Sequence, residues 1–309
     1  MNNKLYIISG CLSRETISHL LYNINTRGFV WRGFTSKEKH MIPSSAYYSV
    51  CNGQAGIGNY KKCDTVQPVF IMGELERIAY HINNKNKLGK YPFEIPDELS
   101  DFLFPHCLGE MKFLNNLKER MKIDYYPKSN LLLQAASYAQ HYFGGTMLLD
   151  FSVNPLKALF FSIGKNDDFD KDSWLFGMPV NIFQNHKDTL SGEEGYRFDL
   201  YLPSYFENIR IQNQEGIFVY HSFNMELVCQ GQSFRFMNIL EIFENMFKNY
   251  DRLELNDIEE KSKTINSNEF DDSIDICYLL LKVPKEEKKY LKHFLNSIEI
   301  DDNFMLDKQ

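Results

Sequence analysis

Residues 140–155, QHYFGGTMLLDFSVNP, place a histidine, two adjacent glycines, an aspartate and a serine in a run otherwise built of core residues. The preceding residues 131–142 are apolar almost all round, which is typical of a central helix. The polar exceptions share one helix face, because they are spaced at i, i+3, i+4 and i+7. They are Gln134, Ser137, Tyr138 and His141. This stripe indicates either the wall of a cleft or polar groups satisfied within the core.

The residues after this helix predict a glycine turn, a strand and a second helix. Gly144 and Gly145 end the first helix, and residues 146–152, TMLLDFS, predict a buried strand. Asn154 is a favoured N-cap residue, and Pro155 suits the first helical position.

Two polar side chains, Asp150 and Ser152, come near the end of the predicted strand, just before the second helix begins. A helix N-terminus attracts anions such as phosphate. The polar residues are thus predicted to lie where three elements meet, as in a binding site. At the end of a buried strand, Asp150 also suits a structural hydrogen-bond acceptor.

The rest of the chain predicts one α+β domain, with helices around a mixed, mostly antiparallel sheet. Residues 13–25 carry a helical stripe of apolar residues that Gly28 ends, and residues 29–33, FVWRG, predict a short strand. We expect a helical segment over residues 1–28 and a single domain over residues 29–309, with an acidic C-terminal elaboration after Asp251.

Composition narrows the function classes. A hydrophobic fraction of 43% supports a large core, and a net charge of −7 argues against a general electrostatic hold on nucleic acid. No run approaches 18 uninterrupted apolar residues, so we expect a cytoplasmic protein without a membrane partner. The six cysteines include no C-x-x-C pair and predict buried free thiols rather than a zinc site or disulfides.

Several stretches, taken in order, resemble the bacterial FRG domain, which is named for a Phe-Arg-Gly motif. Trp31, Arg32 and Gly33 match that motif with Trp in place of Phe. LLLQAASYAQHYFGGTMLLDFSVNPLKALFFSI resembles the central signature of the family, and RIQNQEGIFVYH resembles a later one. The closing LLLKVPKEEKKYLKHFLNSIEIDDNFML resembles the last strand and helix. The resemblance covers residues 29 to 308. This chain departs from the family pattern at Met147, where the family has an arginine.

A more distant likeness is to ADP-ribosyltransferases. The stretches VWRG, FSVNPLKALFF and QNQEGIFV resemble three motifs of these enzymes in the same order. The likeness implies an ADP-ribosyltransferase-like core with NAD as the substrate. Arg32 would bind the NAD pyrophosphate through its forked guanidinium, with Gly33 and Asn154 beside the bound nucleotide. Ser152 would hold the sugar or the loop, and His141 would belong to the same site.

The likeness leaves the catalytic acceptor open. Transferases of this kind use a carboxylate to bind the ribose hydroxyl and to stabilise the developing positive charge. The matching position is Gln214, which is neutral. Its neighbour Glu215 would face the other side of a strand, because side chains alternate. Catalysis would rest on Glu215 through a bulge or on Asp150, or would be absent. Arg32 and Asp150 also suit a buried ion pair.

The resemblances together imply an NAD-using ADP-ribosyltransferase or NAD-hydrolase-like effector in bacterial anti-phage defence or toxin activity. The expected partners are a nucleotide and a protein target or partner defence protein. The main alternative is a noncatalytic nucleotide-sensing or protein-interaction module that keeps the same polar pocket. A nuclease or nucleic-acid binder is a second alternative, which the acidic balance of the chain disfavours.

Overall fold

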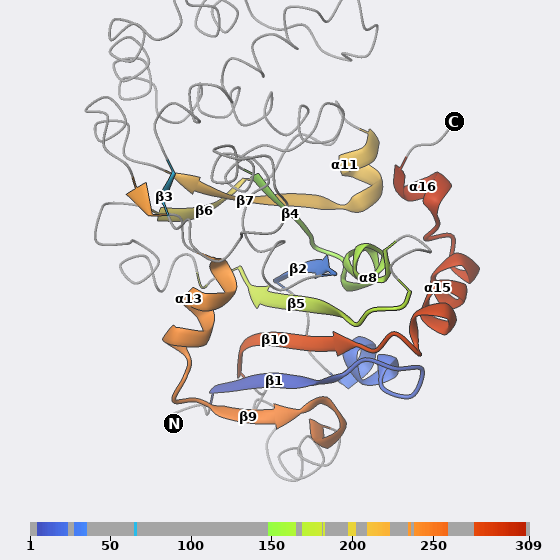
Figure 1. The fold of residues 1–309 in the computed structure, drawn as a ribbon, viewed down its shortest axis with the longest axis horizontal. Coiled ribbons are helices and arrows are strands. Elements are labelled where there is room, and N and C mark those ends of the chain that lie inside the picture. The colour runs from blue at the N-terminus through green and yellow to red at the C-terminus, as the bar shows by residue number, and fades with distance from the viewer. Residues whose placement is uncertain are drawn as a thin grey trace, which may run out of the picture.

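A computed structural model describes the chain over eleven separate stretches. These are residues 5–23, 28–35, 65–66, 148–164, 169–180, 182, 197–201, 209–222, 234–235, 238–258 and 275–306. Most of this part of the chain belongs to one sheet and the helices that pack on it (Figure 1). The predicted helix over residues 131–142, with His141, and the turn at Gly144 and Gly145 lie outside the described residues.

The central feature is an eight-stranded sheet with the order β6-β7-β4-β2-β5-β10-β1-β9. In that order the strands are Arg197–Tyr201, Gly216–Ser222, Leu148–Ser152, Phe29–Phe34, Ser173–Pro179, Asp275–Val283, Leu5–Cys11 and Asp251–Glu254. Only the pairings of β1 with β10 and with β9 are parallel, and the other pairings in this sheet are antiparallel. The predicted α+β fold with a mixed, mostly antiparallel sheet is therefore confirmed. A separate short pair joins β3 (Thr65–Val66) to β8 (Phe234–Arg235).

The first residues of the chain differ from the helical segment predicted there. Leu5–Cys11 form β1 between two parallel neighbours, and only the short π-helix His19–Asn23 follows as a regular helix in the described residues before β2. Tyr6, Ile7 and Ile8 are all buried. A strand that is covered on both faces carries a continuous apolar run rather than an alternating pattern, so a short apolar run does not reveal which element it forms.

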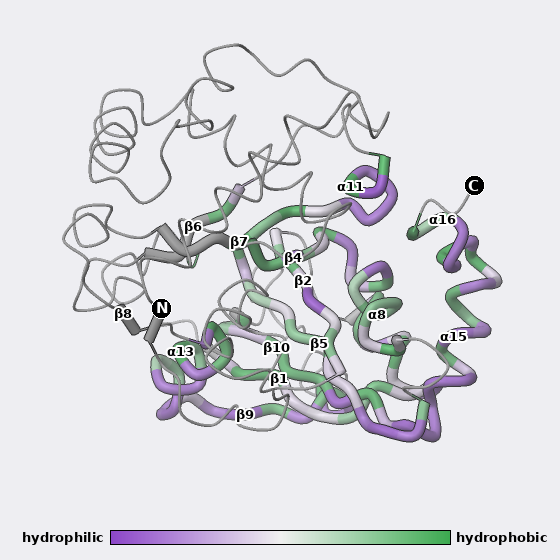
Figure 2. Tube along the Cα trace, turned by 45° about the horizontal axis from the view of Figure 1, so that its top comes forward, coloured by the Kyte–Doolittle hydropathy of each residue, from purple (hydrophilic) through white to green (hydrophobic). Residues whose placement is uncertain are grey.

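Helices cover both faces of the sheet. One core cluster includes residues of α8 (Pro155–Ile163), α15 (Lys288–Ser297) and α16 (Asp302–Leu306), and another includes residues of α13 (Ile239–Met246). α11 (Ile209–Gln214) leads directly into β7, and the 3-10 turn Leu255–Asp257 follows β9. Hydrophobic residues follow the central strands, whereas α15 and β9 are mostly hydrophilic (Figure 2). Several residues of α15 and most of β9 are accordingly exposed.

The helix after β4 forms as the sequence predicts. The Asn154 side chain accepts a hydrogen bond of 3.0 Å from the main-chain N–H of Leu156, and Pro155 occupies the first helical position. Gly164 ends α8 with a φ of 72°. The N-cap, the proline and the C-terminal glycine all act locally, which is why the sequence pattern places this helix correctly.

Two glycines allow close packing around β2. A Cβ on Gly33 would lie 1.9 Å from the main-chain oxygen of Ala158, because α8 crosses β2 at this point. A Cβ on Gly177 would lie 2.4 Å from the six-membered ring of Trp31, its register partner across β2 and β5. These two contacts bring α8 and the Trp31 ring against the backbone of the sheet.

The described residues also bear on two of the composition-based predictions. Within them, no helix combines the length and the apolar character that a membrane crossing requires. Cys11 and Cys277 are the two cysteines in these stretches, and neither forms a disulfide bond. Cys277 is buried, as predicted, whereas Cys11 is exposed.

Gly33→Ala is expected to lower the free energy of unfolding by about 3 kcal/mol, because the added Cβ must displace the backbone of α8. Urea unfolding of both proteins measures this loss. Gly216→Ala is a matched control in a buried strand position, where the Cβ would meet a movable Ile211 side-chain atom at 3.1 Å. An equal loss in both variants would contradict the close contact between β2 and α8.

Candidate functional site

The candidate site is located where β4 separates from β2. Their only register pair in the described residues joins Trp31 to Ser152, whereas β2 pairs with β5 from Phe29 to Phe34. Next to this pair, a guanidinium nitrogen of Arg32, Nη1, donates a hydrogen bond to the main-chain oxygen of Asp150. The Arg32 side chain thus takes the place of a backbone donor at the point where the two strands diverge.

Arg32 is held by neighbours from β4. Its guanidinium carbon lies 5.9 Å from the ring centre of Phe151, within range of a cation–π contact. Burial lowers the pKa of the Arg32 guanidinium, and the negative charge of Asp150 acts in the opposite direction. Arg32 therefore bonds to the main chain of Asp150, and the expected ion pair between the two side chains stays a prediction.

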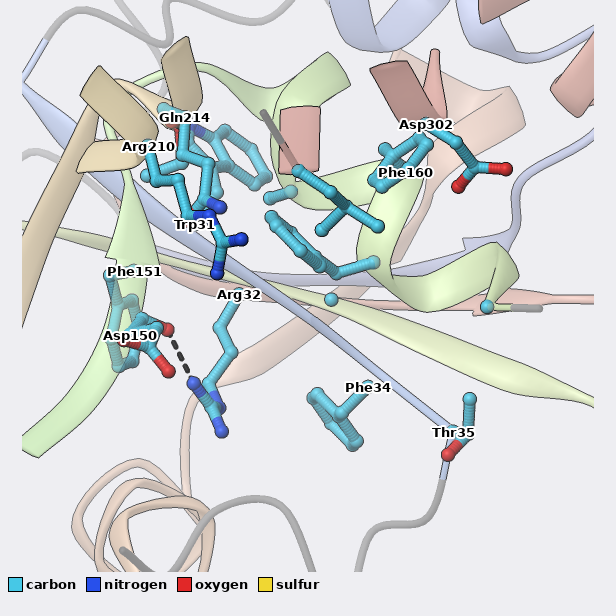
Figure 3. Close-up of a pocket in the computed structure, with 16 residues that line it drawn as sticks. Trp31, Arg32, Phe34, Thr35, Asp150, Phe151, Phe160, Arg210, Gln214 and Asp302 are labelled. Atoms are coloured by element: carbon cyan, nitrogen blue, oxygen red, sulfur yellow. Dashed lines mark hydrogen bonds between the residues drawn. The ribbon is translucent and has the colours of Figure 1, made fainter. Parts of the chain in front are cut away.

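These residues line a pocket of about 610 Å³ (Figure 3). The close-up shows Arg32 beside Asp150, Arg210 and Gln214 near Trp31, and Asp302 near Phe160. The complete lining in the described residues is Trp31, Arg32, Gly33, Phe34, Thr35, Asp150, Phe151, Ser152, Ala158, Phe160, Phe161, Gly164, Arg210, Gln214, Asp302 and Leu306. The pocket therefore combines two guanidinium groups, two carboxylates and several aromatic rings.

Ser152 connects three elements at the wall of the pocket. Its buried hydroxyl donates to the main-chain oxygen of Gln214 at 2.7 Å and accepts from the main-chain N–H of Asn154 at 3.0 Å. These bonds join the end of β4 to the start of α8 and to the end of α11. The observed bonds of Ser152 hold the loop, which is one of the two roles expected for it.

Gln214 and Glu215 differ from the prediction that both lie on a strand. Gln214 is the last residue of α11, and Glu215 turns the chain into β7 with a φ of 48°. The Gln214 amide donates to the main-chain oxygen of Met305 at 3.0 Å, and Glu215 forms an ion pair of 2.7 Å with Lys157. A helical turn, rather than strand alternation, separates their side chains.

The structure brings several of the predicted site residues together. Those that line the pocket are Arg32, Gly33, Asp150, Ser152 and Gln214. Asn154 and Glu215 are absent from the described lining. The functional roles assigned to all of these residues stay predictions, and His141 lies outside the described residues.

Sequence reasoning did not identify two charged residues of the lining, Arg210 and Asp302. Arg210 comes from α11 and belongs to the stretch RIQNQEG. This stretch resembles a family signature, but the resemblance assigns no role to its arginine. Asp302 begins α16 and lies 3.6 Å from the Lys292 ammonium. The docking of α16 brings it to the pocket, because Asn213 and Gln214 both bond to its main chain. That contact joins residues about 90 positions apart, and no local sequence pattern predicts it.

Comparisons with known proteins support one family. The model of the FRG domain matches residues 77–171, which include β4 and α8, so the resemblance to this family is confirmed over that range. Searches of curated proteins and of solved structures found no match. The likeness to ADP-ribosyltransferases stays a prediction.

Ser152→Ala is expected to destabilise the protein by about 1–3 kcal/mol, because the buried oxygen of Gln214 loses its donor and the N–H of Asn154 loses its acceptor. Thermal or urea unfolding measures the change. Ser162→Ala is the matched control, since this buried hydroxyl donates to the main-chain oxygen of Leu159 within the same helix, α8, and its loss should cost less. A Ser152→Ala protein as stable as wild type would contradict the structural role.

Proposed function

We propose that the pocket binds a nucleotide, with NAD as the first candidate, and that the chain is an NAD-using ADP-ribosyltransferase or NAD hydrolase. The observation that carries this proposal is that two guanidinium groups and a carboxylate from separate elements share one aromatic-lined pocket. Its volume of about 610 Å³ is within the range of small-molecule sites. Arginine charge suits a pyrophosphate, and aromatic rings suit a base or a nicotinamide ring.

In the proposed reaction the bond between the nicotinamide nitrogen and ribose C1′ breaks. The electron pair goes to the nitrogen and neutralises the ring, while positive charge develops on the ribose. Water, or a nucleophile of a protein target, adds to C1′ and releases a proton. A carboxylate placed near the ribose favours the charged transition state.

Asp150 is the acceptor that we assign to the ribose. Of the three candidates expected from the sequence, Gln214 bonds to Met305 and Glu215 pairs with Lys157 outside the described lining. Asp150 lies in the pocket beside Arg32, with its main-chain oxygen tied to the guanidinium. In this proposal Arg32 and Arg210 supply positive charge for the pyrophosphate.

A second candidate function is noncatalytic nucleotide sensing. The observation that favours it is that Gln214, at the position matched to the acceptor of ADP-ribosyltransferases, is neutral and is tied to the main chain of α16. Such a module would bind the same nucleotide in the same pocket and would leave it intact. A role in anti-phage defence or toxin activity belongs to the proposal in either form, with a protein target or a partner defence protein as its recipient.

Asp150→Asn is expected to lower the rate of nicotinamide release from NAD by at least about 100-fold, because the amide keeps the shape of the side chain but loses the charge. Binding is expected to persist, as a rise in melting temperature with NAD or ADP-ribose. Liquid chromatography of nicotinamide and thermal melts give the two measurements.

Arg210→Ala serves as the comparison, since loss of a phosphate-binding cation should weaken the melting shift itself. Nicotinamide release by Asp150→Asn at the wild-type rate would contradict the assigned acceptor. A wild-type melting shift without any nicotinamide release would favour the sensing function. Wild-type protein without any shift at millimolar NAD or ADP-ribose would overturn nucleotide binding.

A further inference from the structure

Trp31 is a core residue by position and yet carries a polar atom. The side chain is fully buried at 0% exposure, and it also lines the pocket. Its indole Nε1–H has no hydrogen-bond acceptor anywhere in the part of the chain that the structure describes. A buried donor without a partner is costly, and buried indole N–H groups usually have one.

The packing of the indole explains which edge is anchored. A Cβ on Gly177 would meet Cζ3, Cε3 and Cη2, so the six-membered ring lies against β5. The Nε1 edge is on the far side of the ring system from these atoms, and it is therefore directed away from β5. On the other side of β2, the register partner of Trp31 is Ser152, whose hydroxyl is bonded to Gln214.

The packing function of Trp31 does not use the nitrogen. Contact with Gly177 and with the ring of Phe29, at 5.8 Å between ring centres, involves carbon surface that a phenylalanine also offers in part. A tryptophan here adds one hydrogen-bond donor that the core itself does not need.

We infer that Trp31 is a specificity-determining residue, whose indole N–H donates a hydrogen bond to an acceptor oxygen of the nucleotide bound in the pocket. This inference rests on the proposed nucleotide binding. Trp31 and Arg210 both line the pocket drawn in Figure 3, so the indole and the proposed phosphate-binding cation belong to the same site. Arg210 is half-buried, and side chains at binding sites commonly change rotamer when a ligand arrives. A rearrangement of such lining side chains on binding would give the ligand access to the indole.

The first test compares the affinity of wild type, Trp31→Phe and Trp174→Phe for NAD and for ADP-ribose by isothermal titration calorimetry. Trp31→Phe keeps a ring and removes the N–H, so binding is expected to weaken about 3- to 10-fold, the effect of one hydrogen bond. Trp174 is the second of the two tryptophans and is absent from the described lining, so Trp174→Phe is expected to bind like wild type. Melting without ligand shows whether Trp31→Phe remains folded.

The two ligands distinguish the source of the acceptor. Equal weakening for NAD and ADP-ribose places the oxygen on the shared phosphates or sugars, and weakening for NAD alone places it on the nicotinamide carboxamide. Unchanged affinity of a folded Trp31→Phe protein for both ligands would overturn the inference and leave the proposed function intact. Failure of wild type to bind either ligand would overturn both.

The second test does not depend on the folding of Trp31→Phe. In the Trp174→Phe protein, Trp31 is the sole tryptophan, and its fluorescence reports the indole directly. A new hydrogen bond from the indole N–H is expected to shift the emission maximum when NAD or ADP-ribose saturates the site. An unchanged emission spectrum at saturation, with binding confirmed by calorimetry, would contradict contact between the nucleotide and Trp31.

Discussion

The divergence of β4 from β2 is the constraint on which the site depends. An antiparallel pair that continued past Trp31 and Ser152 would satisfy its carbonyls with backbone donors and would leave no space between the strands. Here Arg32 donates to the main-chain oxygen of Asp150 instead. One side chain thus satisfies a buried backbone acceptor and, at the same time, brings a positive charge to the wall of the pocket.

This arrangement explains why structural and functional readings of Arg32 are not exclusive. Its hydrogen bond to the main chain and its contact with Phe151 support the strands, while its charge faces a pocket that also contains Arg210. Asp150 also has two roles, because its main-chain oxygen accepts the hydrogen bond from Arg32 and the residue lines the pocket. The candidate site is therefore part of the sheet, and the same residues support the strands and line the pocket.

The C-terminal helix completes the pocket from a distance. Side chains at the end of α11 bond to the main chain of α16, and this contact brings Asp302 and Leu306 to the lining. The ion pair of Lys157 with Glu215 supports the same corner from α8, and the Lys157 ammonium also lies 5.3 Å from the ring centre of Phe304. The C-terminal elements are thus joined to α11 and α8, and the pocket is lined by residues from four separate parts of the sequence.

Sequence alone determined the elements whose signals are local. The N-cap at Asn154, the proline after it and the buried strand before it follow from short-range chemistry, and the mixed sheet follows from the order of such elements. The local likeness at Gln214 predicted a strand, and this prediction was wrong, because Gln214 ends a helix and Glu215 forms a turn. Tertiary structure alone decided the place of β1 within the sheet, the docking of α16 and the presence of Arg210 in the pocket. These features depend on contacts between residues far apart in the chain, and periodicity and spacing carry no information about such contacts.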